Sequence, residues 1–141
     1  MGVGAVNYWA NTEVKLFERE DGLKLILKEL QKRNTQDYND LLECGRLIAL
    51  AMLCIGSGVR FHKDAHALLV YLRESRLEEI LDERLEKLGK ETPKPPEDLS
   101  KMTEKDYKDL MNNISDYAEL SEVRYYVRFL KGGLEKANGS N

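Results

Sequence analysis

The chain is poor in the residues that usually carry chemistry. Its 141 residues include two histidines, two cysteines and one tryptophan, and no catalytic or ligand-binding motif stands out. Cys44 and Cys54 lie ten residues apart in one predicted helix, which places their Cα atoms roughly 15 Å apart, too far for a disulfide. We therefore expect buried thiols in a reducing compartment, and a cytoplasmic protein that is not an enzyme and uses no cofactor.

The chain also lacks a long apolar run and a strong excess of charge. Its most prominent uninterrupted apolar run, residues 47–55, is nine residues long, whereas a membrane-spanning helix needs about 20. The formal net charge is −3, from 22 basic and 25 acidic residues, which disfavours a globally basic nucleic-acid-binding protein. No membrane partner is expected.

Proline is scarce, and the three prolines all fall in the segment 89–98. Proline does not fit inside a helix, so this segment predicts a linker. Elsewhere apolar residues recur at the i, i+3, i+4, i+7 spacing of helices, and no segment alternates convincingly with period two. The pattern predicts an all-α fold of five to seven helices.

The apolar run 47–55 predicts the centre of that fold. A helix that is apolar on every face belongs in a protein interior. We predict a buried central helix near residues 36–55, with Thr35 as its N-cap and a capping box at Ser75 and Glu78 further along the chain. A compact bundle is the first interpretation, and a short helical-repeat solenoid, which would bury the same stripes, is the alternative.

Residues 99–133 predict a C-terminal helical hairpin. Thr103 and Asp106 have the spacing that opens a helix, and Gly132-Gly133 has the composition that ends one. The first helix of this hairpin carries four apolar residues: Tyr107, Leu110, Met111 and Ile114. The hairpin is too small to bury a core of its own, so we expect it to dock on the preceding helices and form a single domain over residues 1–141.

The segment Gly22-Leu-Lys-Leu-Ile-Leu-Lys-Glu-Leu30, followed by the apolar helix that ends near Leu53, resembles one hairpin of an armadillo or HEAT-like array. In those repeats a glycine opens a helix with leucines at Gly-Leu-x-x-Leu-Leu-x-x-Leu spacing, and a more apolar helix packs behind it. The resemblance covers residues 22–58 and implies a protein-binding scaffold.

Basic and aromatic residues alternate on the last predicted helix, at Arg124, Tyr125, Arg128 and Lys131. These four are the candidate partner-binding residues. The leading hypothesis is a non-catalytic protein-interaction module, an adaptor or an inhibitor-like partner, that binds another protein through an exposed helical face. The alternative is a nucleic-acid-binding accessory protein that uses the same stripe to hold phosphates and stack bases. The sequence indicates no oligomeric state.

His62 and His66 are four residues apart and would share one face of a helix, a spacing that can chelate a transition metal. In the helix of a zinc metalloprotease a glutamate follows the first histidine, but here Lys63 occupies that position. The chain has no third histidine. We therefore predict no metal site.

Overall fold

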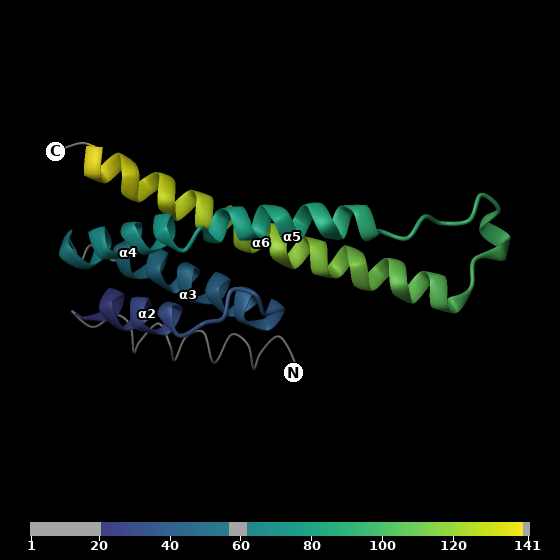
Figure 1. Cartoon of the computed structure of the whole chain (residues 1–141), viewed down its shortest axis with the longest axis horizontal. Helices are drawn as coiled ribbons and strands as arrows, with labels where there is room; N and C mark the ends of the chain where they lie inside the picture. Colours follow the sequence, from purple (N-terminus) through teal and green to yellow (C-terminus); the bar gives the residue numbers. More distant parts are fainter. Residues whose placement is uncertain (1–20, 57–61, 140–141) are drawn as a thin grey trace.

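The computed structural model describes residues 21–56 and 62–139 of the chain (Figure 1). Within these ranges the chain forms five α-helices and one 3-10 turn, and no β-strand. The helices pack as an all-α bundle, which confirms the predicted fold class. The elements in order are α2 (Gly22–Gln31), α3 (Tyr38–Gly56), α4 (His62–Glu74), α5 (Leu77–Glu91), η1 (Leu99–Lys101) and α6 (Glu104–Gly139).

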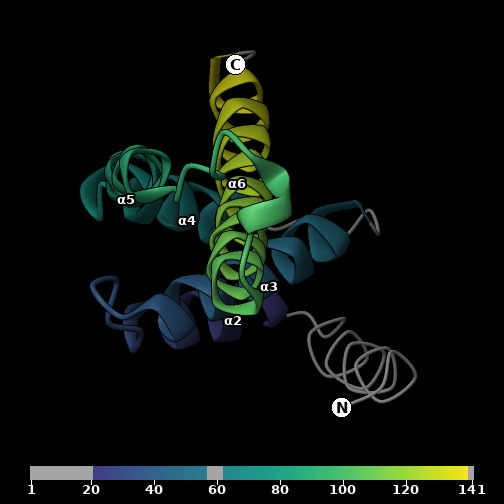
Figure 2. The same ribbon diagram turned by 90° about the vertical axis from the view of Figure 1, so that its right-hand side faces the viewer.

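Helix α6 joins the bundle together, because it packs against α3, α4 and α5. Helix α2 packs on α3 and α4. Figure 1 shows that α5 and the first half of α6 run side by side beyond the other helices as an arm, and Figure 2 shows α4 and α5 on one side of α6. These contacts between helices far apart in sequence are those of a bundle rather than of a solenoid, in which each unit contacts only its neighbours.

Helix α3 supplies much of the core, as the apolar run predicts, but it begins and packs differently from the prediction. The backbone N–H of Asp40 donates to the Asp37 carboxylate at 3.0 Å, so Asp37 caps the helix and the predicted cap at Thr35 was wrong. Leu53 is 56% exposed although it lies inside the apolar run. The helix is therefore buried along most, but not all, of its surface.

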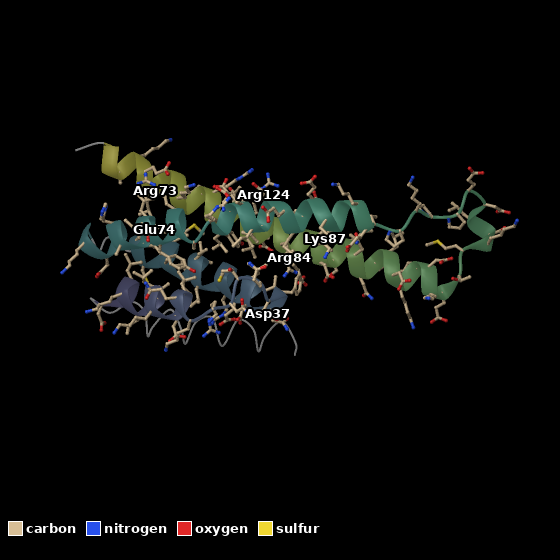
Figure 3. The ribbon with its side chains drawn as sticks, viewed as in Figure 1. Asp37, Arg73, Glu74, Arg84, Lys87 and Arg124 are labelled. Atoms are coloured by element: carbon tan, nitrogen blue, oxygen red, sulfur yellow. The ribbon has the colours of Figure 1, made fainter. Side chains whose placement is uncertain are left out.

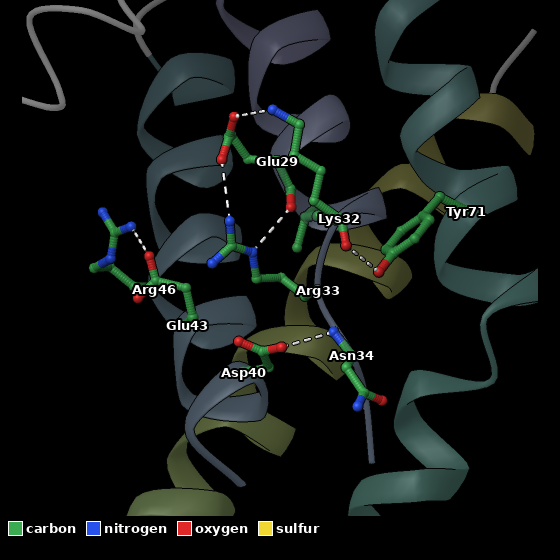
Figure 4. Close-up of polar contacts among 9 residues, drawn as sticks. Glu29, Lys32, Arg33, Asn34, Asp40, Glu43, Arg46 and Tyr71 are labelled. Atoms are coloured by element: carbon green, nitrogen blue, oxygen red, sulfur yellow. Dashed lines mark hydrogen bonds and ion pairs between the residues drawn. The ribbon is translucent and has the colours of Figure 1, made fainter. Parts of the chain in front are cut away.

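The end of α2 is tied to its own last turn and to α4 (Figure 4). The Arg33 guanidinium donates to the backbone carbonyl and the carboxylate of Glu29, both at 3.2 Å. The Tyr71 hydroxyl on α4 donates to the Leu30 carbonyl at 3.3 Å, and burial raises the pKa of Tyr71 to about 12. These bonds satisfy carbonyls that the end of a helix would otherwise leave without partners.

The predicted capping box at Ser75 and Glu78 does not form. Arg76 stands at the N-cap of α5 in the left-handed conformation (φ 54°), and its side chain makes no capping bond. Glu78 instead contacts Arg128 and Lys131 on α6. Glu78 thus lies in the first turn of α5, as expected, but its side chain binds residues of α6 and does not cap its own helix.

The proline-containing linker is shorter than the predicted segment 89–98. Helix α5 continues through Gly89 to Glu91, and the non-helical chain begins at Thr92. Asn113 on α6 donates to the Leu88 carbonyl at 3.2 Å, and its amide oxygen lies 2.8 Å from the Thr92 hydroxyl. The end of α5 is therefore fastened to α6, which keeps the two helices of the arm together.

The predicted hairpin at 99–133 was wrong, because α6 is one continuous helix to Gly139. Its start is as expected: the N–H of Thr103 donates to the Asp106 carboxylate at 3.0 Å, and the N–H of Asp106 donates to the Thr103 hydroxyl at 3.1 Å. Gly132-Gly133 stays helical. Glycine weakens a helix by about 1 kcal/mol relative to alanine, which does not break a helix whose flanking residues are packed.

Gly45 allows α3 and α6 to approach each other closely. A Cβ atom at Gly45 would lie 2.5 Å from Cγ2 of Val123 on α6, well inside van der Waals contact. Val123 belongs to the buried face of α6, so its side chain has little room to move. The absence of a side chain at Gly45 therefore fixes the distance between the two helices.

Gly45→Ala is expected to lower the free energy of unfolding by about 1–3 kcal/mol because it overpacks this contact, although alanine is the better helix former. Urea unfolding followed by circular dichroism measures the change. Gly89→Ala on α5 is the matched control, because nothing lies within 4 Å of its Cβ position. That variant should be unchanged or more stable by up to about 1 kcal/mol. Equal stability of Gly45→Ala and the wild type would contradict the close approach.

Candidate functional site

Three of the four predicted partner-binding residues face α5 and form ion pairs with it. Arg124 Nε lies 2.8 Å from Asp82 Oδ1, and Figure 3 shows Arg124 where α5 and α6 run together. Arg128 Nε lies 2.7 Å from Glu78 Oε1, and Lys131 Nζ lies 3.4 Å from Glu78 Oε2. We call this set of five charged residues the α5–α6 ladder. Its positive charges are largely compensated within the chain.

The ladder changes the protonation of one of its carboxylates. Partial burial alone would raise the pKa of Glu78, but hydrogen bonds from Arg128 and Lys131 outweigh it and hold that pKa below its usual range. The ionised form of Glu78 is thus favoured in the folded state. The ladder connects residues some 50 positions apart, and it stabilises the packing of α6 on α5.

Glu78→Gln tests the ladder through its pH dependence. Because the folded-state pKa of Glu78 is depressed below an unfolded value of about 4.3, its stabilisation is present above that value and is lost as pH falls through the folded pKa. We expect the wild type to exceed Glu78→Gln by about 1 kcal/mol in free energy of unfolding at neutral pH, with the difference disappearing in acid.

Urea unfolding at pH 7 and in acid measures this difference. Glu83→Gln, the same chemical change at an exposed position of α5, is the matched control and should alter stability by less than about 0.5 kcal/mol at either pH. A Glu78→Gln difference that is the same at both pH values would show that the ladder does not stabilise the fold.

Tyr125, the fourth predicted residue, lies away from the ladder. Its ring stacks on Phe129 with centroids 6.2 Å apart and an interplanar angle of 24°, and both rings are more than 60% exposed. Tyr126 contacts Tyr125 edge-on at 6.0 Å. The basic and aromatic residues that alternate in the sequence thus belong to two different faces of α6.

The aromatic pair belongs to an apolar stripe on the solvent-facing side of α6, which we call the outer face. Its five large side chains are between 43% and 64% exposed. At 3.6 residues per turn the outer face lies roughly 170° from the buried stripe of the same helix. The outer face consists of Tyr107, Met111, Ile114, Tyr125 and Phe129, and the buried stripe consists of Leu120, Val123, Val127, Leu130 and Leu134.

The first half of α6 turns polar residues toward the bundle, which is why its apolar residues are exposed. The Tyr38 hydroxyl on α3 donates to Glu119 at 2.8 Å and also lies 3.2 Å from an Asp116 carboxylate oxygen. Burial and these two carboxylates raise the pKa of Tyr38. Asn113 binds the end of α5 from the same half of the helix.

An apolar groove of about 320 Å³ borders the outer face near the C-terminal end of α6. Its lining comes from α6 and from the last turns of α3. A Cβ atom at Gly133, one of the lining residues on α6, would meet nothing within 4 Å. The lining residues are Met52, Ile55, Phe129, Leu130, Gly133, Leu134 and Ala137.

The remaining candidates are the two cysteines and the two histidines. Cys44 and Cys54 are buried, and burial is the main cause that raises the pKa of Cys44 to about 11. His66 is exposed on α4, and the side chain of His62 lies outside the described residues. In residues 21–56 and 62–139 no three His, Cys, Asp or Glu side chains gather as metal ligands would. None of the helices described here combines the length and apolarity needed to cross a membrane.

Comparison with protein-family models, with curated proteins and with solved structures finds no match to this chain. The resemblance of residues 22–58 to an armadillo or HEAT-like hairpin therefore stays a prediction, and residues 57–58 of that segment lie outside the described residues.

Proposed function

We propose that the protein is a cytoplasmic, non-catalytic protein-interaction module, an adaptor or an inhibitor-like partner, whose contact surface is the outer face of α6. The observation that supports this most is the exposure of five large apolar side chains in one line on a single helix. Isolated exposed apolar residues are ordinary, whereas several of them gathered along one side of a helix are typical of a docking surface.

The composition and size of the outer face suit a protein partner. Tyrosine is enriched among the residues that dominate the energy of protein interfaces, and two of the five residues are tyrosines. Aromatic side chains bury 150–250 Å² each, so the exposed fractions of the five residues amount to roughly 500 Å². Adding the groove beside Phe129 brings the surface toward the ~800 Å² that one side of a typical interface buries.

The alternative, nucleic-acid binding through Arg124, Arg128 and Lys131, receives less support from the geometry. Each of these side chains is already paired with Glu78 or Asp82, so a phosphate would have to displace a carboxylate. Three cations against two carboxylates leave little net positive charge along the α5–α6 ladder. Binding of this kind would weaken steeply with salt, which separates it from docking on the outer face.

Affinity capture from a native lysate tests the proposal, using the tagged full chain, with and without nuclease, and mass spectrometry. The test variant carries Tyr125→Glu and Phe129→Glu, which place two charges on the outer face. The control carries Gln31→Glu and Asn39→Glu, the same added charge at exposed positions of α2 and α3. We expect the test variant to capture at least about tenfold less partner than the wild type. The control should capture as much partner as the wild type.

Three outcomes are informative. A partner that survives nuclease and depends on Tyr125 and Phe129 supports the proposal. Equal capture by the test variant and the wild type overturns the outer face as the contact surface. Capture that disappears with nuclease favours the nucleic-acid alternative, and Arg124→Gln and Arg128→Gln should then reduce it.

A further inference from the structure

We infer that the partner of the outer face is a second copy of this chain, and that two α6 helices pack antiparallel about a two-fold axis at Ala118. This inference rests on the proposed function, because it names the occupant of the same surface. Self-association through an isologous contact requires one patch to be complementary to itself. Five observations on α6 and η1 support such a contact.

Four of the five residues of the outer face are placed symmetrically about Ala118 along the helix. Tyr107 and Phe129 each lie eleven residues from Ala118, and Met111 and Tyr125 each lie seven residues from it. In an antiparallel pair centred there, Tyr107 of one copy would meet Phe129 of the other, and Met111 would meet Tyr125. Aromatic pairs and sulfur–aromatic contacts are both favourable beyond their buried area.

The centre of the stripe has the small side chain that a helix crossing needs. Ala118 is exposed and lies on the outer face, between Ile114 and Tyr125. Across the axis Ile114 of one copy would face Glu122 of the other. The Tyr126 hydroxyl donates to the Glu122 carboxylate at 2.7 Å, which holds this carboxylate on the flank of its own helix. With Ala118 and Glu122 counted, the positions from Tyr107 to Phe129 have a 4-3-4 spacing that repeats every eleven residues, so they remain on one side of a nearly straight helix.

The described contacts within one copy of the chain give no reason for the two glycines at positions 132 and 133 of α6. Gly132 and Gly133 are helical, and a Cβ atom at either would meet nothing within 4 Å, so packing among the described residues does not require glycine. Each weakens the helix by about 1 kcal/mol relative to alanine. Glycine is typical of places where another group approaches the backbone closely, and Gly133 lines the apolar groove.

The two ends of the contact also match. Leu99 is 69% exposed in η1, just before α6 begins. It lies nineteen residues before Ala118, and Ala137 in the groove lies nineteen residues after it. An antiparallel pair would therefore bring η1 and Leu99 of each copy to the groove of the other. This gives each exposed leucine an apolar site that the described residues of its own copy do not give it.

The area is sufficient for a dimer. Two outer faces of roughly 500 Å² each give about 1,000 Å², which is the lower limit of specific protein interfaces, before Leu99 and the groove are added. The chain supplies both the apolar stripe and its complement, so no further component is needed.

The mass of the untagged full chain by sedimentation equilibrium, from about 1 to 200 μM, tests the inference. We expect a concentration-dependent approach to twice the 16.2 kDa monomer mass. Ala118→Arg brings two like charges together at the axis and should raise the dimer dissociation constant at least about tenfold. Because Ala118 is exposed, the helix content and the thermal melting of the Ala118→Arg variant should stay close to those of the wild type at low concentration.

Symmetric cross-linking provides a second readout. Ala118→Cys should form an intermolecular disulfide under mild oxidation, since the two sulfurs would meet at the axis. Ser115→Cys, an exposed position on the same helix but off the outer face, is the matched control and should cross-link far less. The native Cys44 and Cys54 are buried, so they contribute little background.

A monomeric mass throughout the range, or equal cross-linking at the two positions, overturns the inference. If the monomeric chain still captures a foreign protein in a Tyr125- and Phe129-dependent manner, the proposed function survives with a different occupant. If it neither self-associates nor captures a protein, both the inference and the proposed function fail.

Discussion

The arrangement of the bundle depends on the close contact between α3 and α6 at Gly45 and Val123. Helix α6 is the element that α3, α4 and α5 share, and α2 is connected to it through α3 and α4. When α6 lies this close to α3, the stripe from Leu120 to Leu134 is buried and the opposite side of the same turns faces solvent. The outer face is therefore a geometric consequence of how α6 is held, and its apolar composition is what requires a functional explanation.

Much of the fold was predictable from the sequence because the relevant signals are local. Helical periodicity identified the helices, the prolines located the linker, and Thr103 with Asp106 marked the start of α6. The end of the last helix was not predictable in the same way. Gly132-Gly133 has the composition of a stop, but a weak local preference gives way when the neighbouring leucines on both sides are packed in a tertiary core.

The candidate site was only partly predictable, because periodicity shows that a helix has an apolar side without showing what that side meets. Of the four candidate partner-binding residues, Tyr125 is exposed on the outer face. Tyr107, Met111 and Ile114 were expected to contribute to a hairpin that docks on the core, yet Asn113 and Asp116 occupy that side. The acidic partners of Arg124 and Arg128 lie on α5, more than 40 residues away, where spacing along one helix gives no information. Phe129 could have been found from its spacing, because it lies four residues after Tyr125 and therefore on the same side of the helix.

Because Cys44 and Cys54 are buried on α3, their reaction with a thiol reagent measures how readily the bundle opens. A thiol reagent reacts with the thiolate, and the Cys44 thiol, with its pKa near 11 and no exposed surface, offers almost none while the helices stay packed. When the bundle closes faster than the reagent reacts, the rate of modification at Cys44, divided by the rate at an exposed thiol, gives the free energy of the opening that exposes it. This free energy can be compared with the values that amide hydrogen exchange gives along the same helix.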